Sequence, residues 1–89
     1  MYGDDIVFVV GLNLRSVAQY ALNDIGWVRT APRYFEDSDG RTIKYVVSAD
    51  DLNGYQGNLI YLIDGYNLRD DWYEIDERIS ERGFERHFL

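Results

Sequence analysis

Residues 6–25 read IVFVVGLNLRSVAQYALNDI, an apolar segment followed at once by an amphipathic one. Residues 6–10 form an unbroken β-branched and aromatic run, which is typical of a central strand covered on both faces. Apolar side chains then recur at helical spacing over residues 14–25. Asn13 is a good N-cap and Gly26 suits the position after a helix end, so we expect a helix over 14–25.

Two further apolar runs, at 42–47 and 59–63, predict two more strands. The string Asp-Ser-Asp-Gly at 37–40 is a strong turn signal directly before the first of them. Pro32 confines any strand nearby to an edge or a start. We therefore expect a hairpin with an edge strand near 33–36.

The remaining segments predict helices on either side of the third strand. Ser48 reads as the N-cap of a very short helix that Gly54 closes. A longer helix is expected over 70–82, because apolar residues recur there at helical spacing. Its inward side chains are Trp72, Ile75 and Ile79.

Strands that alternate with helices predict a single α/β domain over 1–89, with a mostly parallel sheet and right-handed crossovers. The simplest topology places strand 43–47 on one side of strand 6–10 and strand 59–63 on the other. Segment 33–36 then forms an antiparallel edge. This is a sheet of three or four strands with two main helices, a miniature flavodoxin-like or Rossmann-like half.

Composition excludes several classes of function. The 89 residues include no Cys and one His, His87, expected near a frayed terminus, so disulfides, zinc and other metal sites are not expected. A formal net charge of −7 repels nucleic-acid backbones and anionic membranes, which argues against direct binding to either. Met1–Asp5 is acidic where a secretory leader is basic, and run 6–10 is too short for a membrane span, so a cytoplasmic location is expected.

A crevice is expected where the parallel strands end, between the loops at 11–13 and 64–67. The loop after the first strand has one Gly and matches neither G-x-x-x-x-G-K-[ST] nor G-x-G-x-x-G, which favours an ordinary strand-to-helix turn. Asp64 resembles a magnesium-binding acid at a strand end, yet Asp64-Gly65 is also a good turn. The candidate ligand-binding residues at this rim are Gly11, Asn13, Ser48, Asp50, Asp64, Tyr66 and Asn67.

The helix at 70–82 is rich in acids. One interpretation is a solvated face on which Glu74 pairs with Arg78 at i, i+4. Another is an acidic, tyrosine-bearing docking surface for a partner protein, and a third is DNA mimicry, although the acids are interleaved with Arg. The candidate partner surface comprises Tyr66, Asp70, Asp71, Tyr73, Glu74 and Glu77.

Enzymatic activity is not expected. The one His, His87, is expected at the terminus, which argues against a Ser–His arrangement, and the absence of Cys excludes Cys–His. The turn at 37–40 resembles the opening of a calcium loop, but the later ligands do not follow, so it reads as a hairpin turn. No cofactor is expected.

Three segments carry a resemblance to small α/β orphan proteins encoded by actinobacteriophages. They are VVGLN at 9–13, SADDLNG at 48–54 and LIDGYNLRDDW at 62–72. The resemblance spans most of the chain and implies a phage accessory protein that acts inside the host. It supplies no catalytic residues to carry over.

Three hypotheses of function follow. The first is a non-enzymatic interaction protein that binds a host or phage protein through its acidic, tyrosine-bearing surface. The second is a small-ligand module that holds a nucleotide or phosphorylated metabolite at the strand carboxyl ends, and the third is an acidic DNA mimic. An uncovered edge at 33–36 would also allow a homodimer by strand pairing.

Overall fold

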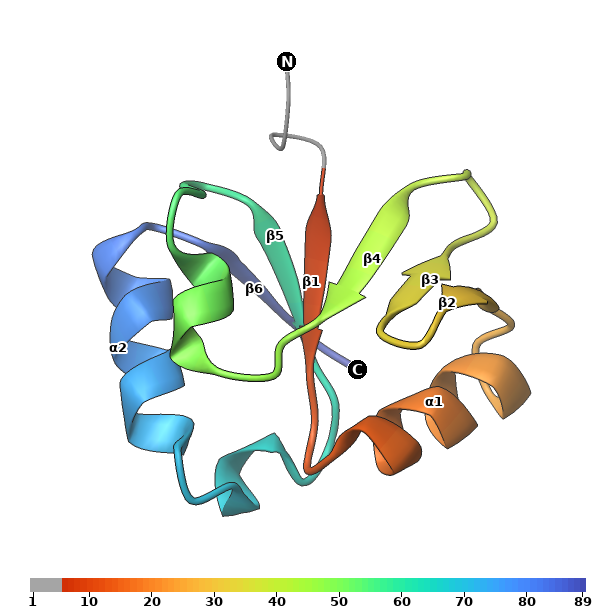
Figure 1. The fold of residues 1–89 in the computed structure, drawn as a ribbon, viewed down its shortest axis with the longest axis horizontal. Coiled ribbons are helices and arrows are strands. Elements are labelled where there is room, and N and C mark those ends of the chain that lie inside the picture. Colours follow the sequence, from red (N-terminus) through yellow and green to blue (C-terminus); the bar gives the residue numbers. More distant parts are fainter. Residues whose placement is uncertain (1–5) are drawn as a thin grey trace.

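A mixed sheet of six strands forms the centre of the computed structural model, which describes residues 6–89 (Figure 1). Met1–Asp5, the acidic segment considered above, lies outside the described residues. The strands are β1 Val7–Val10, β2 Val28–Ala31, β3 Tyr34–Glu36, β4 Thr42–Tyr45, β5 Leu59–Leu62 and β6 Glu85–Phe88. Their order across the sheet is β2-β3-β4-β1-β5-β6.

The three central strands have the predicted arrangement. β1 lies between β4 and β5 and is parallel to both, so that Phe8 has Lys44 on one side and Ile60 on the other. β3 pairs antiparallel with β4, which confirms the hairpin. The α/β class and the parallel centre of the sheet are therefore confirmed.

The helices cover opposite faces of the sheet, as Figure 1 shows for the two α-helices. Val7 and Val9 of β1 pack in one core with Val17 of the first helix, whereas Phe8 lies in a second core with Ile75 of the other. Because successive side chains of a strand point to opposite faces, the run at 6–10 has to be apolar throughout. The helices are α1 Leu14–Asn23, η2 Ala49–Leu52, η3 Tyr66–Leu68 and α2 Trp72–Glu81, where η marks a 3-10 helix.

The predicted helix signals act as expected. Asn13 caps α1, its Oδ1 accepting a hydrogen bond of 2.8 Å from the backbone N–H of Ser16. Gly26 has a φ of 75°, the left-handed conformation that favours glycine after a helix. Ile75 and Ile79 are fully buried, while Trp72 is half-buried.

The sheet is larger than predicted, and 33–36 is not its edge. β3 lies between β2 and β4, so the outer position belongs to β2, which was not predicted. Three of its four residues are exposed, and the pairing register shifts between Arg29 and Ala31. A strand that buries little on either face lacks the apolar alternation from which strands are recognised.

The opposite edge is β6, also not predicted, and it is parallel to β5. His87 therefore lies in a strand rather than at a frayed end. Its ring contacts Tyr61 edge-on at 6.0 Å between centroids, and its Nε2 is 3.1 Å from a carboxylate oxygen of Glu85. Within residues 6–89, no helix is long and apolar enough to cross a membrane.

Candidate functional site at the strand carboxyl ends

The carboxyl edge of the central strands is occupied by the side chain of Arg69. Only 8% of this side chain is exposed. Its Nη1 donates to the carbonyl of Val46 at 2.8 Å and its Nη2 to that of Val47 at 2.7 Å, both just past the end of β4. Nη1 also lies 3.5 Å from the carbonyl oxygen of Gly11, which follows β1. The guanidinium thus joins the ends of two neighbouring strands.

Asp71 completes the coordination of this guanidinium. Its Oδ1 accepts from Nε of Arg69 at 2.9 Å and its Oδ2 from Nη2 at 3.0 Å, a bidentate pair. The Tyr45 hydroxyl lies 3.4 Å from Nη1, and burial raises the pKa of Tyr45. An arginine side chain has five N–H donors. Two point to Asp71, one to each of two carbonyls, and the last toward Gly11 and Tyr45, so none is left for a ligand.

Gly11 and Asn13, the first two candidate ligand residues, have structural roles. A Cβ on Gly11 would lie 2.4 Å from Cγ2 of Val17, so glycine is needed for the close approach of α1 to β1. The side-chain oxygen of Asn13 is used in capping α1. Neither feature depends on a phosphate group, and both fit the ordinary strand-to-helix turn.

Ser48 and Asp50 belong to the η2 segment on the α2 face of the sheet. Ser48 precedes η2, and its backbone N–H donates to Asp51 Oδ2 at 3.4 Å, as the N–H of Val47 does at 2.7 Å. Asp50 is exposed and lies 3.5 Å from Nη1 of Arg78. These residues close a turn and tie it to α2.

Asp64, Tyr66 and Asn67 form the connection between β5 and α2. Asp64 and Asn67 are exposed, and the expected turn is present, with Gly65 at a φ of 100°. The Tyr66 ring packs edge-on against Trp72 at 4.8 Å between centroids. Tyr66 therefore covers the core beneath α2, and its ring is not directed at a shared ligand site.

The acidic surface, by contrast, is exposed. We define the acidic face as the outward side chains of η3 and the first turns of α2: Leu68, Asp70, Tyr73, Glu74 and Glu77. Tyr73 is 88% exposed and Leu68 is 70% exposed. A shallow depression of about 450 Å³ adjoins this face, lined by Leu12, Leu68, Arg69, Asp70 and Asp71.

The expected pair between Glu74 and Arg78 does not form. Arg78 instead donates to Asn53 Oδ1 at 3.0 Å and lies 3.5 Å from Asp50, because its side chain turns toward η2. Within residues 6–89, Asp70, Glu74 and Glu77 make no salt bridge. Within this described part of the chain, no cation therefore compensates their charges at short range.

Arg69, whose side chain occupies the carboxyl ends of β4 and β1, was not among the candidate residues. The carbonyl groups that its guanidinium contacts lie 22, 23 and 58 positions away in the chain, although Asp71 is only two positions away, so the local sequence does not mark this role. In residues 6–89, no group of three His, Cys, Asp or Glu side chains is arranged to hold a metal ion.

Comparison with protein-family models, with curated proteins and with solved structures finds no match to this chain.

Proposed function

We propose that the chain is a non-enzymatic interaction protein that binds a basic segment of another protein through the acidic face. The observation that supports this proposal is the exposure of Leu68 and Tyr73 among carboxylates that have no cationic partner within the described chain. Exposed tyrosine supplies apolar contact area with a polar end, and such residues often dominate binding energy.

Charge sets the chemistry of the partner. A net charge of −7 attracts basic surfaces over several ångströms and raises their rate of encounter. The contact itself combines Tyr73 and Leu68 with Asp70, Glu74 and Glu77. The best fit is therefore a partner segment in which Lys or Arg flanks an apolar residue.

Arg69 argues against the alternative of a small-ligand module. A nucleotide that extended from the predicted rim at 11–13 toward Ser48, over the ends of β1 and β4, would have to displace a buried guanidinium and break its pairing with Asp71. The cost of leaving buried charges and carbonyls unpaired is several kcal/mol. A phosphate group also finds no spare donor on Arg69.

DNA mimicry is a less well supported hypothesis for the function of the acidic face. Arg78 and Arg86 pair with Asp50 and Asp76, so that cations interrupt any track of carboxylates along α2. A phage origin and an accessory role inside an actinobacterial host belong to this proposal as well. For this reason the partner is sought in the lysate of an actinobacterial host.

The test is quantitative affinity capture from lysate of an actinobacterial host, with and without phage infection. We expect the double variant Tyr73→Ala/Glu77→Arg to lose at least tenfold of the captured partner, because both the apolar anchor and the charge are removed. Asp39→Arg is the matched control. It introduces an arginine for an acid in the exposed β3–β4 turn, away from α2 (Figure 1).

Two results would contradict the proposal. The first is equal loss of the captured protein with Asp39→Arg, which would indicate a general charge effect. The second is a rise of roughly ten degrees in the thermal midpoint with a nucleotide or phosphorylated metabolite plus magnesium, abolished by Asp64→Ala. That rise would favour the small-ligand module.

A further inference from the structure

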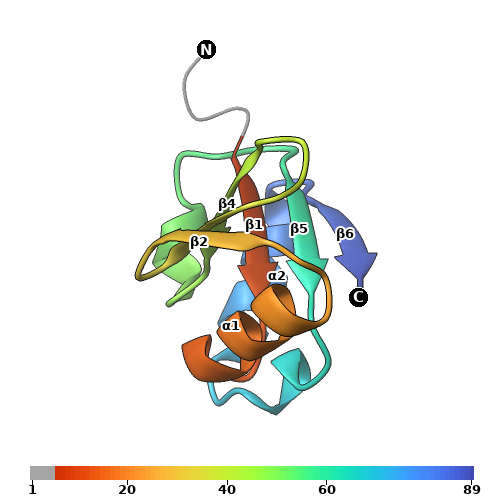
Figure 2. The same cartoon turned by 90° about the vertical axis from the view of Figure 1, so that its right-hand side faces the viewer.

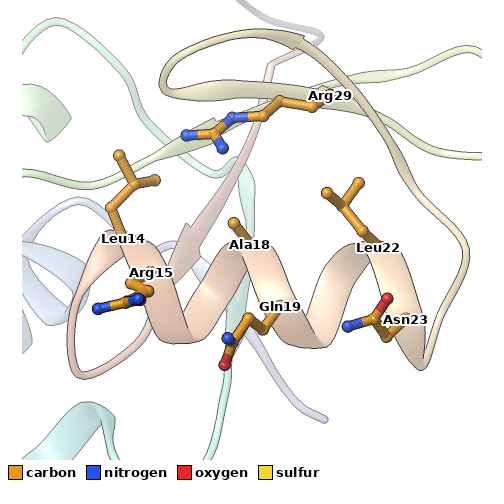
Figure 3. Close-up of a pocket in the computed structure, with 7 residues that line it drawn as sticks. All are labelled: Leu14, Arg15, Ala18, Gln19, Leu22, Asn23 and Arg29. Carbon is orange, nitrogen blue, oxygen red and sulfur yellow. The ribbon is translucent and has the colours of Figure 1, made fainter.

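A second concave surface lies on the other face of the sheet, between α1 and the edge strand β2 (Figure 3). Its volume is about 490 Å³. Leu14, Ala18 and Leu22 form one ridge of α1 that points toward β2, and the side chain of Arg29 reaches over it from the strand. Arg15, Gln19 and Asn23 line the outer side. We call this surface the α1/β2 groove.

The strand that borders the groove has a free edge. Among residues 6–89, β2 is the outermost strand and its one pairing partner is β3. Figure 2 shows β2 running beside α1 at the surface of the molecule. The backbone groups on the outer edge of such a strand can pair with an added strand. An apolar helical ridge beside that edge offers positions for the side chains of the added strand.

The charge of the groove is opposite to that of the molecule. Within the structured chain, five of the other seven cations pair with carboxylates, in Arg41–Asp37, Lys44–Asp51, Arg69–Asp71, Arg78–Asp50 and Arg86–Asp76, whereas Arg33 and Arg82 do not. Arg15 and Arg29 make no salt bridge within residues 6–89. Arg15 also lies in the first turn of α1, which contains no acid and where a cation opposes the helix dipole.

The guanidinium of Arg29 is held in place by contacts that use only some of its hydrogen-bond donors. Its Nη2 donates to the carbonyl of Pro32 at 2.6 Å, and its guanidinium lies 5.9 Å from the centre of the Phe35 ring. Arg29 and Phe35 are paired across the two strands, so both face α1. The remaining donors of Arg29 are available to an acceptor in the groove.

We propose that the α1/β2 groove binds an extended segment of a partner protein, which adds to β2 as a strand. Its inward side chains combine an apolar residue over Ala18 with carboxylates toward Arg15 and Arg29. The ridge from Leu14 to Leu22 rises about 12 Å along the helix, and a four-residue strand extends about 13 Å. The groove therefore matches the length of a short added strand.

A second copy of the chain fits the groove less well than an acidic segment does. Symmetric pairing of two β2 strands would bring the Arg29 side chains of both copies into the same short stretch of sheet. Like charges at close range in a sheet are destabilising. The groove also lies on the face of the sheet opposite α2, so this proposal is independent of the acidic face.

The test is selection from a phage-displayed library of random ten-residue peptides with the folded protein as bait. We expect enrichment of peptides that alternate apolar residues with Asp or Glu, and at least tenfold weaker binding of the enriched peptide to Arg29→Glu and to Leu22→Glu. Both positions are exposed, so the variants keep the core intact. The matched control is Arg33→Glu, an identical charge reversal at an exposed residue outside the groove.

Hydrogen exchange separates strand addition from any other mode of binding. The enriched peptide should slow exchange of β2 amides while leaving those of α2 unchanged. Four results would overturn the proposal. Three of them are no acidic enrichment, equal weakening by Arg33→Glu, and protection confined to residues outside 14–31. A concentration-dependent dimer with protected β2 amides would overturn it in favour of a second copy.

Discussion

Arg69 and Arg29 show two different uses of the same side chain. Arg69 is nearly buried, and its donors end on backbone carbonyls, a hydroxyl and Asp71. Arg29 lies at an exposed edge, and its side chain makes one hydrogen bond within the described chain, to the carbonyl of Pro32. The donors left over, rather than the presence of a cation, are what make Arg29 the proposed binding residue and Arg69 a structural one.

Replacement of Arg69 should have the largest effect on stability. Arg69→Ala leaves Asp71 and the carbonyls of Val46 and Val47 without their donor in a nearly buried site. We expect a loss of about 3–5 kcal/mol in the free energy of unfolding. Arg29→Ala is the control and should cost less than about 1 kcal/mol. Urea denaturation of both variants measures the difference, and similar losses would remove the distinction drawn above.

The next largest effect on stability is expected at Gly11, which follows β1. Gly11→Ala would place a methyl group against Val17, and we expect a cost of about 1–3 kcal/mol from overpacking. Adding Val17→Ala should recover part of that cost, because the clashing Cγ2 is then absent. A double-mutant cycle measures this coupling. Strictly additive losses would show that Gly11 serves something other than packing.

The smallest expected effect is on the pH dependence of stability, and it concerns Asp37 in the β3–β4 turn. Burial raises the pKa of Asp37, but hydrogen bonds from the backbone and side chain of Arg41 and from the N–H of Asp39 outweigh it and hold the pKa below its ordinary value. A carboxyl whose pKa is lowered by folding stabilises the fold above its unfolded pKa, near 3.9, and loses that contribution as pH falls through the folded pKa.

Asp37→Asn should therefore flatten the dependence of unfolding free energy on pH below about 4, with little further change between pH 5 and 7. Denaturation curves of the variant and the wild type from pH 2 to 7 provide the measurement. Asp39→Asn is the matched control, since the Asp39 side chain accepts none of the hydrogen bonds in this turn. An unchanged pH profile for Asp37→Asn would contradict the assignment.

The parts of the fold that could be predicted are those that bury apolar side chains at a regular period. β1 and α1 are of this kind, because covering both faces of a central strand demands the run at 6–10 and the stripe that follows it. The two edge strands could not be predicted. β2 and β6 are exposed along most of their length and therefore lack any pattern of burial.

The candidate sites divide in the same way. The acids and Tyr73 could be named because an exposed helical face follows from the positions of Ile75 and Ile79. The position of Arg69 over the ends of β1 and β4 could not be predicted, since it depends on carbonyl groups that only the folded topology brings to this side chain. The groove likewise requires β2 to be known before Arg29 and α1 can be placed together.

The position of β6 has a consequence for synthesis of the chain on the ribosome. β5 emerges first, with the apolar segment LIYL at 59–62, and β6 covers its outer edge only after α2 has followed. During that interval β5 is the last strand of the nascent sheet and offers its backbone to other chains. Rapid folding of α2 would shorten the time in which a nascent chain can aggregate.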